Sequence, residues 1–311
     1  MVIDLKLSMS KNNIFFLKKF LKFKKKTALI ENGKHFSYQD LIAFANMISE
    51  KLHKKKSLVF LLGQNNFETL VAYISFTFKG YAIALIDHRI NNIFLKKLIK
   101  TYKPSYVYCE KDKCNFKSLY TSIFIFKKYI LYKKKKISNT IINKELMLLI
   151  STSGSTGSPK LVRLSYKNIE SNINSIVKYL NIKKEDITIT TLPISYVYGL
   201  SVVNTHLSSG ATIVLTNKSM VEKDFWKIVE KYSVNNFSGV PYNYTLIERF
   251  KKFDLPKSIK YTTQAGGKMN NLLINKIINL YKKKKIKFIQ MYGAAEATSR
   301  MSYLKWLYAP K

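Results

Sequence analysis

Residues 151–160 read Ser-Thr-Ser-Gly-Ser-Thr-Gly-Ser-Pro-Lys and directly follow the apolar run Leu146–Ile150. Hydroxyl residues, two glycines and a terminal lysine therefore stand where a buried strand is expected to end. Glycine allows the backbone to approach an anion closely because it has no Cβ. Successive backbone N–H groups and hydroxyls donate to phosphate oxygens. The stretch predicts a loop that binds a polyphosphate, to which Lys160 adds a point charge.

The loop does not follow the Walker pattern, which ends in Gly-Lys-Ser/Thr at the start of a helix. Here Pro159 separates Gly157 from Lys160. The order of residues instead resembles the phosphate loop of the adenylate-forming (AMP-binding) superfamily, which includes acyl-CoA synthetases, adenylation domains of peptide synthetases and luciferases. A Ser/Thr/Gly cluster alone is also typical of a flexible linker. The resemblance implies contacts with the nucleotide from these residues: Thr152, Ser153, Gly154, Ser155, Thr156, Gly157 and Lys160.

A second segment with this resemblance is a glycine turn near residue 266. An expected strand that begins at Tyr261 runs into Ala265, Gly266 and Gly267. Taken alone, two glycines after a strand indicate only a turn. The resemblance implies that this turn carries the adenine of the nucleotide.

The third segment is Tyr292-Gly293-Ala294-Ala295-Glu296, at the end of an expected strand over 286–289. It resembles the superfamily's Tyr-Gly-x-Thr-Glu, in which the tyrosine packs on adenine, the threonine touches the α-phosphate and the glutamate holds Mg²⁺. An aromatic face suits a purine, and Mg²⁺ takes one or two carboxylates together with phosphate oxygens. Ala295 stands in place of the threonine, so one phosphate contact is missing unless Thr298 or a water supplies it. Tyr292, Gly293 and Glu296 are the predicted site residues here.

The acid substrate is assigned to a run that follows another expected strand, over 187–192. Residues 193–200 resemble the superfamily's Pro-Leu-x-His-x-x-Gly, with Tyr196 at the position where histidine is common. Tyr196, Tyr198 and Val240, the last within the aromatic segment 237–242, are the predicted wall of the acid pocket. Their character favours an apolar acyl or aryl group, as in fatty-acid metabolism. The alternative is that these side chains belong to the hydrophobic core.

The activity that the resemblance implies is activation of a carboxylic acid. The carboxylate attacks the α-phosphate of ATP and gives an acyl-adenylate and pyrophosphate, without a side-chain nucleophile. Lys160 and the Mg²⁺ bound by Glu296 are the expected catalytic groups, acting by positioning and by neutralising phosphate charge. In the superfamily a thiol, that of coenzyme A or of a carrier phosphopantetheine, then accepts the acyl group.

The expected fold is α/β, with layered, largely parallel sheets flanked by helices, as in the large N-terminal domain of adenylate-forming enzymes. Short apolar runs alternate with helical patterns, which favours βα units. A strand over 57–62, a helix Phe67–Lys79 capped by Asn65 or Asn66 and closed by Gly80, and a strand over 81–87 illustrate the pattern. We expect two subdomains, about 1–138 and 139–311, joined at the lysine-rich segment 127–138.

The resemblance runs from about residue 30 to Tyr303 and stops before the superfamily's ribose-binding aspartate, hinge and small C-terminal domain. The expectation is therefore a truncated N-terminal domain, and an incomplete enzyme whose partner is a separately encoded C-terminal domain or a carrier protein. A nucleotide-binding remnant without catalysis is the alternative.

Composition excludes disorder, since 47% of the 311 residues are hydrophobic and 14% are aromatic. The formal charge of +36 leaves a basic nucleic-acid-binding protein as a distant alternative. Its lysines are scattered in short runs, which favours solvated lysines and predicts no nucleic-acid partner. Two cysteines, Cys109 and Cys114, indicate a reducing cytoplasm. No apolar run has the length of a membrane-spanning helix.

Overall fold

The computed structural model describes residues 19–113, 116, 118–136, 140–151, 160–249 and 255–304. These residues divide into two compact units, of which unit 1 comprises 19–26 with 36–170 and unit 2 comprises 27–35 with 171–304. The division falls inside helix α5 (Tyr166–Leu180). The expected joint at 127–138 does not coincide with it, because that segment contains strand β7 (Tyr129–Lys134), which belongs to the sheet of unit 1.

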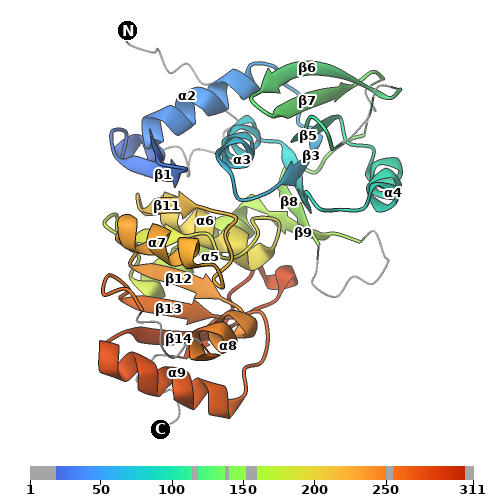
Figure 1. The fold of residues 1–311 in the computed structure, drawn as a ribbon. Coiled ribbons are helices and arrows are strands. Elements are labelled where there is room, and N and C mark those ends of the chain that lie inside the picture. The colour runs from blue at the N-terminus through green and yellow to red at the C-terminus, as the bar shows by residue number, and fades with distance from the viewer. Residues whose placement is uncertain are drawn as a thin grey trace. The chain divides into compact units, whose positions relative to one another are not determined.

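Unit 1 is built on a seven-stranded sheet in the order β6-β7-β5-β3-β4-β8-β9 (Figure 1). Its other strands are β3 (Leu58–Gly63), β4 (Ala82–Asp87), β5 (Tyr106–Glu110), β6 (Tyr120–Phe126), β8 (Leu146–Ile150) and β9 (Val162–Ser165). The central pairs β5·β3, β3·β4 and β4·β8 are parallel. The outer pairs β6·β7, β7·β5 and β8·β9 are antiparallel.

Helices α3 (Phe67–Lys79) and α4 (Asn92–Tyr102) pack on this sheet, and α2 (Tyr38–Ser49) packs against α3. Leu95, Leu98 and Ile99 of α4 share one hydrophobic cluster with buried residues of β3, β4 and β5, among them the thiol of Cys109. Cys114 lies outside the described residues.

Helix α3 has the bounds that the sequence predicts. Asn66 is its N-cap, and its side-chain oxygen accepts a hydrogen bond of 2.9 Å from the backbone N–H of Thr69. Gly80 ends the helix with φ 81°, the left-handed conformation that glycine adopts without steric cost. The predicted alternation of strand and helix is therefore confirmed for α3, including the residues at both ends of the helix.

Unit 2 contains the eight-stranded sheet, in the order β15-β14-β13-β12-β10-β11-β1-β2. Its strands are β1 (Thr27–Glu31), β2 (Lys34–Ser37), β10 (Ile187–Ile189), β11 (Thr212–Leu215), β12 (Asn236–Gly239), β13 (Tyr261–Gln264), β14 (Lys287–Tyr292) and β15 (Ser302–Leu304). The pairs from β1 to β14 are parallel, whereas β15 is antiparallel to β14. Largely parallel sheets were expected and are confirmed.

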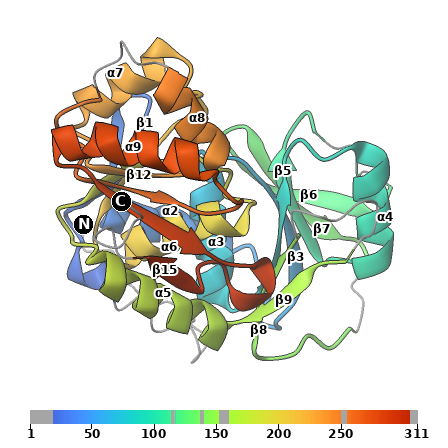
Figure 2. The same ribbon diagram turned by 90° about the horizontal axis from the view of Figure 1, so that it is seen from below.

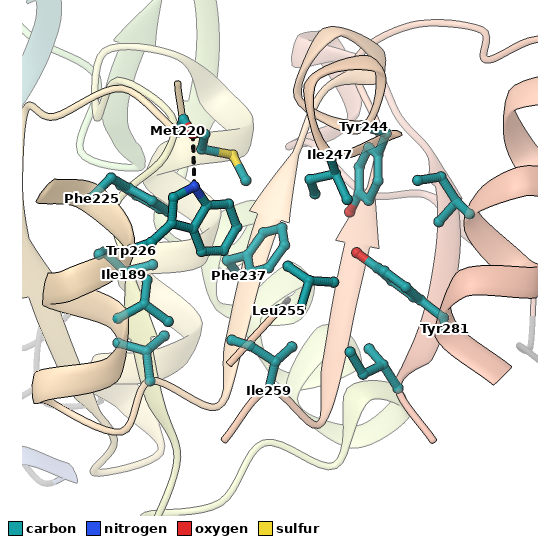
Figure 3. Packing of buried hydrophobic residues seen from close by; sticks show 14 of the residues in the cluster. Ile189, Met220, Phe225, Trp226, Phe237, Tyr244, Ile247, Leu255, Ile259 and Tyr281 are labelled. Carbon is teal, nitrogen blue, oxygen red and sulfur yellow. Dashed lines mark hydrogen bonds between the residues drawn. The ribbon is translucent and has the colours of Figure 1, made fainter. Parts of the chain in front are cut away.

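Helices cover both faces of the sheet in unit 2 (Figure 2). The further helices are α6 (Val197–Ser208), α7 (Lys223–Lys231), α8 (Pro241–Arg249), α9 (Asn271–Lys284) and the short 3-10 helix η2 (Ala295–Ala297). Figure 3 shows the cluster of α7, α8 and α9 on one face, where Trp226 Nε1 donates to the carbonyl of Met220 over 2.8 Å. On the other face α5 and α6 pack against Ala265, Ile289 and Met291.

Candidate functional site

Three neighbouring strands of unit 2 end at the same edge of the sheet. In parallel register, Gly239 of β12 lies opposite Gln264 of β13, and Gln264 lies opposite Gln290 of β14. The predicted site segments begin just beyond these positions, at Val240, at Ala265 and at Tyr292. Ligands of open α/β sheets bind beyond the carboxyl ends of the strands. The fold therefore brings the predicted adenine turn, the predicted adenine-stacking tyrosine and part of the predicted acid pocket to one edge.

The glycine turn is held by its neighbours in the sheet. The Gln264 side chain donates from Nε2 to the carbonyl of Gly267 over 2.9 Å, and Gln290 donates to Gln264 Oε1 over 3.3 Å. Gly266 has φ 80°. A Cβ there would lie 2.6 Å from Tyr196 Oη and 3.1 Å from Val240 Cγ1. Tyr196 and Val240, both predicted for the acid pocket, are thus direct neighbours of the turn predicted for adenine.

The two glutamines that hold the turn were not among the predicted site residues. Each lies at or near the carboxyl end of its strand, which is the only signal that the sequence offers. Gln264 is buried, so its amide must be bonded to remain there without cost. Its bonds to Gly267 and Gln290 supply this and fix the backbone of the turn.

Tyr196 and Tyr198 differ in how deeply they are buried. Tyr198 is buried, its hydroxyl donates to the carbonyl of Thr263 over 3.0 Å, and burial raises its pKa to about 12. Tyr196 is only partly buried, and burial raises the pKa of its hydroxyl as well. Of the aromatic segment 237–242, Phe237 belongs to the core cluster of α7 to α9, whereas Tyr242 is exposed. Within this set, Tyr196 is the aromatic residue beside the glycine turn.

The sequence predicts that the third motif follows its strand. In the structure strand β14 extends through Tyr292, so the motif begins inside the strand. The Tyr292 side chain is 67% exposed, which leaves its ring free to stack on a planar ligand. Gly293 is required next to it, because a Cβ there would lie 1.3 Å from the carbonyl oxygen of Ser299. The backbone turns back after Gly293, so that the Met301 N–H donates to the Tyr292 carbonyl over 2.8 Å.

Glu296 lies on η2 with its side chain exposed to solvent. No ion pair of Glu296 is found within the described ranges, although the chain has a large excess of lysine. No group of three or more His, Cys, Asp or Glu side chains with metal-binding geometry occurs among the described residues. A lone available carboxylate fits an Mg²⁺ ion that takes its other ligands from phosphate and water. Ala295 is buried at the start of η2, and Thr298, also buried, follows it in a left-handed conformation with φ 67°.

The segment predicted to bind phosphate follows β8 of unit 1 and precedes β9. These two strands are antiparallel, with Ile150 opposite Val162, so the next described element is a strand and not the helix that follows a Walker motif. Ser151 and Lys160 are exposed at its two ends. Thr152, Ser153, Gly154, Ser155, Thr156 and Gly157 lie outside the described residues.

None of the helices in the described part of the chain combines the length and apolar character needed to cross a bilayer.

Comparison with known proteins agrees with this geometry. The family model of AMP-binding enzymes matches residues 16–310. Over 255 residues the chain is 25% identical to a 2-succinylbenzoate–CoA ligase of Bacillus cereus, covering 81% of this chain and 51% of that protein. Over 294 residues it is 22% identical to the D-alanine–D-alanyl carrier protein ligase of Lactococcus lactis subsp. lactis, covering 89% and 58%. The chain thus spans about half the length of the curated relatives it matches.

Solved structures show the same fold. The o-succinylbenzoate CoA synthetase of Bacillus subtilis in complex with its acyl-adenylate intermediate superposes with a TM-score of 0.79 at 19% identity, over 95% of this chain and 78% of that one. CmiS6 superposes with a TM-score of 0.80 at 17% identity, over 94% and 73%. The family match over nearly the whole chain and the ordered site segments lead to one conclusion: this chain belongs to the AMP-binding enzyme family.

Proposed function

We propose that this chain binds ATP and a carboxylic acid and takes part in forming an acyl-adenylate, which a thiol then consumes. The observation that carries the proposal is the position of the glycine turn and of Tyr292 at the carboxyl ends of the adjacent parallel strands β13 and β14, with Tyr196 against the turn. The printed names of its relatives support an acid–thiol ligase, with coenzyme A or a carrier-bound thiol as acceptor. A partner domain or carrier protein and a cytoplasmic location belong to the same proposal.

The chemistry needs no nucleophile from the protein. A carboxylate oxygen of the acid attacks the α-phosphorus of ATP, the bond from that phosphorus to the bridging oxygen of the β-phosphate breaks, and the electron pair leaves with pyrophosphate. The protein contributes by aligning the two reactants and by stabilising the charge on the phosphates. In this proposal the backbone at Gly266 and the ring of Tyr292 hold the adenine, and Tyr196 and Val240 hold the acid.

Lys160 and the loop before it are assigned to the β- and γ-phosphates. Glu296 is the residue that would hold Mg²⁺, an ion that neutralises phosphate charge when bound. Its exposed carboxylate supports this assignment. Mg²⁺ remains part of the proposal together with the acid and the thiol.

The experiment is a calorimetric titration of the whole chain with ATP and with AMP, for the wild type and for Lys160→Ala. If Lys160 faces the terminal phosphates, the variant loses about tenfold or more of its ATP affinity, the worth of one bond to a charged group, and little of its AMP affinity. Lys96→Ala is the matched control, since Lys96 is an exposed lysine on α4. Equal losses for the two nucleotides would contradict the placement of Lys160.

A further inference from the structure

The Glu296 loop, residues 293–300, leads from β14 towards β15 and carries Glu296 on η2. Its two ends are joined, since the Ser299 N–H donates to the Ala294 carbonyl over 3.0 Å. The side chain of Glu296 is exposed to solvent. The position of its carboxylate therefore depends on how the loop is held against the rest of unit 2.

Two consecutive residues of the Glu296 loop have a left-handed backbone. Thr298 and Ser299, both buried, have φ values of 67° and 110°. Residues with a Cβ adopt this region only at a cost in free energy. Such backbone persists where its surroundings over-determine it, and it is concentrated at functional sites. Contacts outside the loop must therefore hold this conformation.

Arg300 connects the Glu296 loop to helix α6. Its side chain is only 4% exposed. Its Nε donates to Ser201 Oγ over 3.1 Å, and its Nη2 donates to Thr205 Oγ1 over 3.5 Å. The guanidinium carbon lies 5.5 Å from the centre of the Tyr198 ring. These three partners follow the helical spacing i, i+3 and i+7, so Arg300 lies along one face of α6. Because α6 is buried along its whole length, it offers the loop a fixed support.

Ser201 is the residue of α6 on which the bonds to the loop converge. A serine hydroxyl has one donor and two acceptor lone pairs. Ser201 donates to the Tyr198 carbonyl over 2.8 Å and accepts from Arg300 Nε and, over 3.2 Å, from the Ser299 hydroxyl. A further bond of 3.4 Å joins Asn172 Nδ2 on α5 to the Arg300 carbonyl. The hydroxyl of Ser201 is thus fully used, and two of its bonds hold the Glu296 loop.

A purely stabilising role does not account for an arginine at this position. Among the described residues, no carboxylate forms an ion pair with Arg300. A buried cation without such a partner costs more free energy than a well-packed apolar side chain of similar volume. The hydrogen bonds of a planar guanidinium are directional, however, and they fix one geometry. Arg300 is therefore better suited to defining where the loop lies than to stabilising unit 2.

We propose that Arg300 and Ser201 are positioning residues, which hold the Glu296 loop in its strained conformation and so place the Glu296 carboxylate before nucleotide and metal bind. The inference rests on the proposed function, because that function assigns Glu296 to Mg²⁺. A carboxylate that is already in place loses less conformational freedom on binding, which raises affinity. Arg300 itself touches neither the metal nor the nucleotide and acts through Glu296.

The test is a calorimetric titration of the full chain with ATP, once in Mg²⁺ and once in EDTA. The ratio of the two affinities is the Mg²⁺ enhancement. We expect Arg300→Gln to reduce this enhancement about 3- to 10-fold, the factor that corresponds to ordering one side chain, and to leave the AMP affinity near the wild-type value. Arg300→Lys, which keeps the cation without the planar fork, retains part of the enhancement.

Two control variants keep the full enhancement. Arg249→Gln removes an exposed guanidinium at the end of α8. Tyr281→Phe removes a buried hydrogen bond of 3.4 Å from the Thr262 hydroxyl, on the face of the sheet opposite α6. It therefore matches the loss of a buried bond in unit 2 and leaves the Glu296 loop unchanged.

A second readout needs neither nucleotide nor metal. The N–H groups of Ser299 and Met301 are hydrogen-bonded at the base of the loop, so native-state amide exchange reports on how often it opens. In Arg300→Gln we expect their protection to fall about 10- to 100-fold, the factor for losing a bond to a charged group. The amides of β13 keep their protection. Unchanged protection of Ser299 and Met301 overturns the inference.

Glu296→Gln separates this inference from the proposed function. If Glu296→Gln abolishes the enhancement and Arg300→Gln leaves it intact, the inference fails and the proposed function stands. In the Glu296→Gln background, Arg300→Gln should have no further effect on ATP affinity, and an equal effect in both backgrounds overturns the inference. A wild type without Mg²⁺ enhancement contradicts the metal assignment and the inference with it. If Arg300→Gln does not fold, Ser201→Ala, which removes the shared acceptor, decides by the same criteria.

Discussion

Gly266 and Gly33 share a backbone conformation and differ in their surroundings. Their φ values are 80° and 82°, but a Cβ on Gly33 would meet nothing within 4 Å, whereas on Gly266 it would meet Tyr196 and Val240. We predict that both alanine variants lose about 1–2 kcal/mol of unfolding free energy from the left-handed backbone. Only Gly266→Ala, which must also displace its neighbours, loses nucleotide affinity, by about tenfold or more.

Urea unfolding and calorimetric titration with AMP measure the two effects separately. Gly33→Ala is the control, because it lies in the turn between β1 and β2 and carries the same backbone cost. Full AMP affinity in Gly266→Ala would show that the nucleotide does not use this turn.

Glu296 gives a prediction on metal dependence. Since its carboxylate is exposed on η2 and is assigned to Mg²⁺, Glu296→Gln should remove the effect of Mg²⁺ on ATP affinity and leave AMP affinity unchanged. Titrations with and without EDTA measure this. Glu185→Gln, at an exposed position, serves as control. A variant that retains its Mg²⁺ dependence would place the metal elsewhere.

At the residue scale, the sequence identifies those candidate site residues that belong to a short contiguous motif. The Gly-Gly turn and the Tyr-Gly motif could be found because each needs only its own few residues. The bond from Gln290 to Gln264 could not be found in this way, since β13 and β14 come together only in the folded sheet.

Helix α6 gives a pH prediction through His206. Burial lowers the pKa of this imidazole to about 4, although its Nδ1 lies 2.8 Å from the Val202 carbonyl, a contact that acts the other way. The ordinary value is about 6.5. Between these values the unfolded chain binds a proton that the folded chain does not, so unfolding free energy falls as pH drops from about 6.5 towards 4. The full loss is about 3 kcal/mol for a shift of this size.

Urea unfolding at a series of pH values measures this slope for the wild type and for His206→Gln. The variant should show less pH dependence than the wild type over this range and should resemble it in slope above about pH 7. His35→Gln is the control, since His35 is exposed in β2. An unchanged slope in His206→Gln would mean that other groups dominate acid sensitivity.

At the scale of elements, apolar periodicity with caps predicts the parallel βα core, and α3 shows this most clearly. It does not predict the antiparallel strands at the margins. Between β6 and β7 the chain turns at Lys127, with φ 52°, so lysines that suggested a break are part of a hairpin. Strand β10 ends at Ile189 and not at the expected Leu192. Just beyond it, the Thr190 hydroxyl donates to the Thr216 carbonyl over 3.0 Å and accepts from the Thr216 N–H over 2.9 Å, so side-chain bonds continue the contact with the neighbouring segment.

For the whole molecule, a part of the net charge of +36 comes from lysines placed at helix C-termini. Helix α9 carries Lys282, Lys283 and Lys284 in its last turn, and α4 and α7 also have lysine there. Cations at this end interact favourably with the helix dipole. These positions favour lysines that are exposed to solvent over lysines that form a nucleic-acid-binding surface. The affinity of such a surface for nucleic acid would fall steeply as the salt concentration rises.

The measurement that tests the central claim most directly is calorimetric titration of the full chain with an acylsulfamoyl adenosine, AMP and duplex DNA at low and high salt. An acyl-adenylate site predicts one analogue bound per chain, with an affinity at least about tenfold above that for AMP, because the acyl group adds contacts, and with little dependence on salt. Absence of analogue binding, together with DNA affinity that collapses as salt rises, would contradict the account.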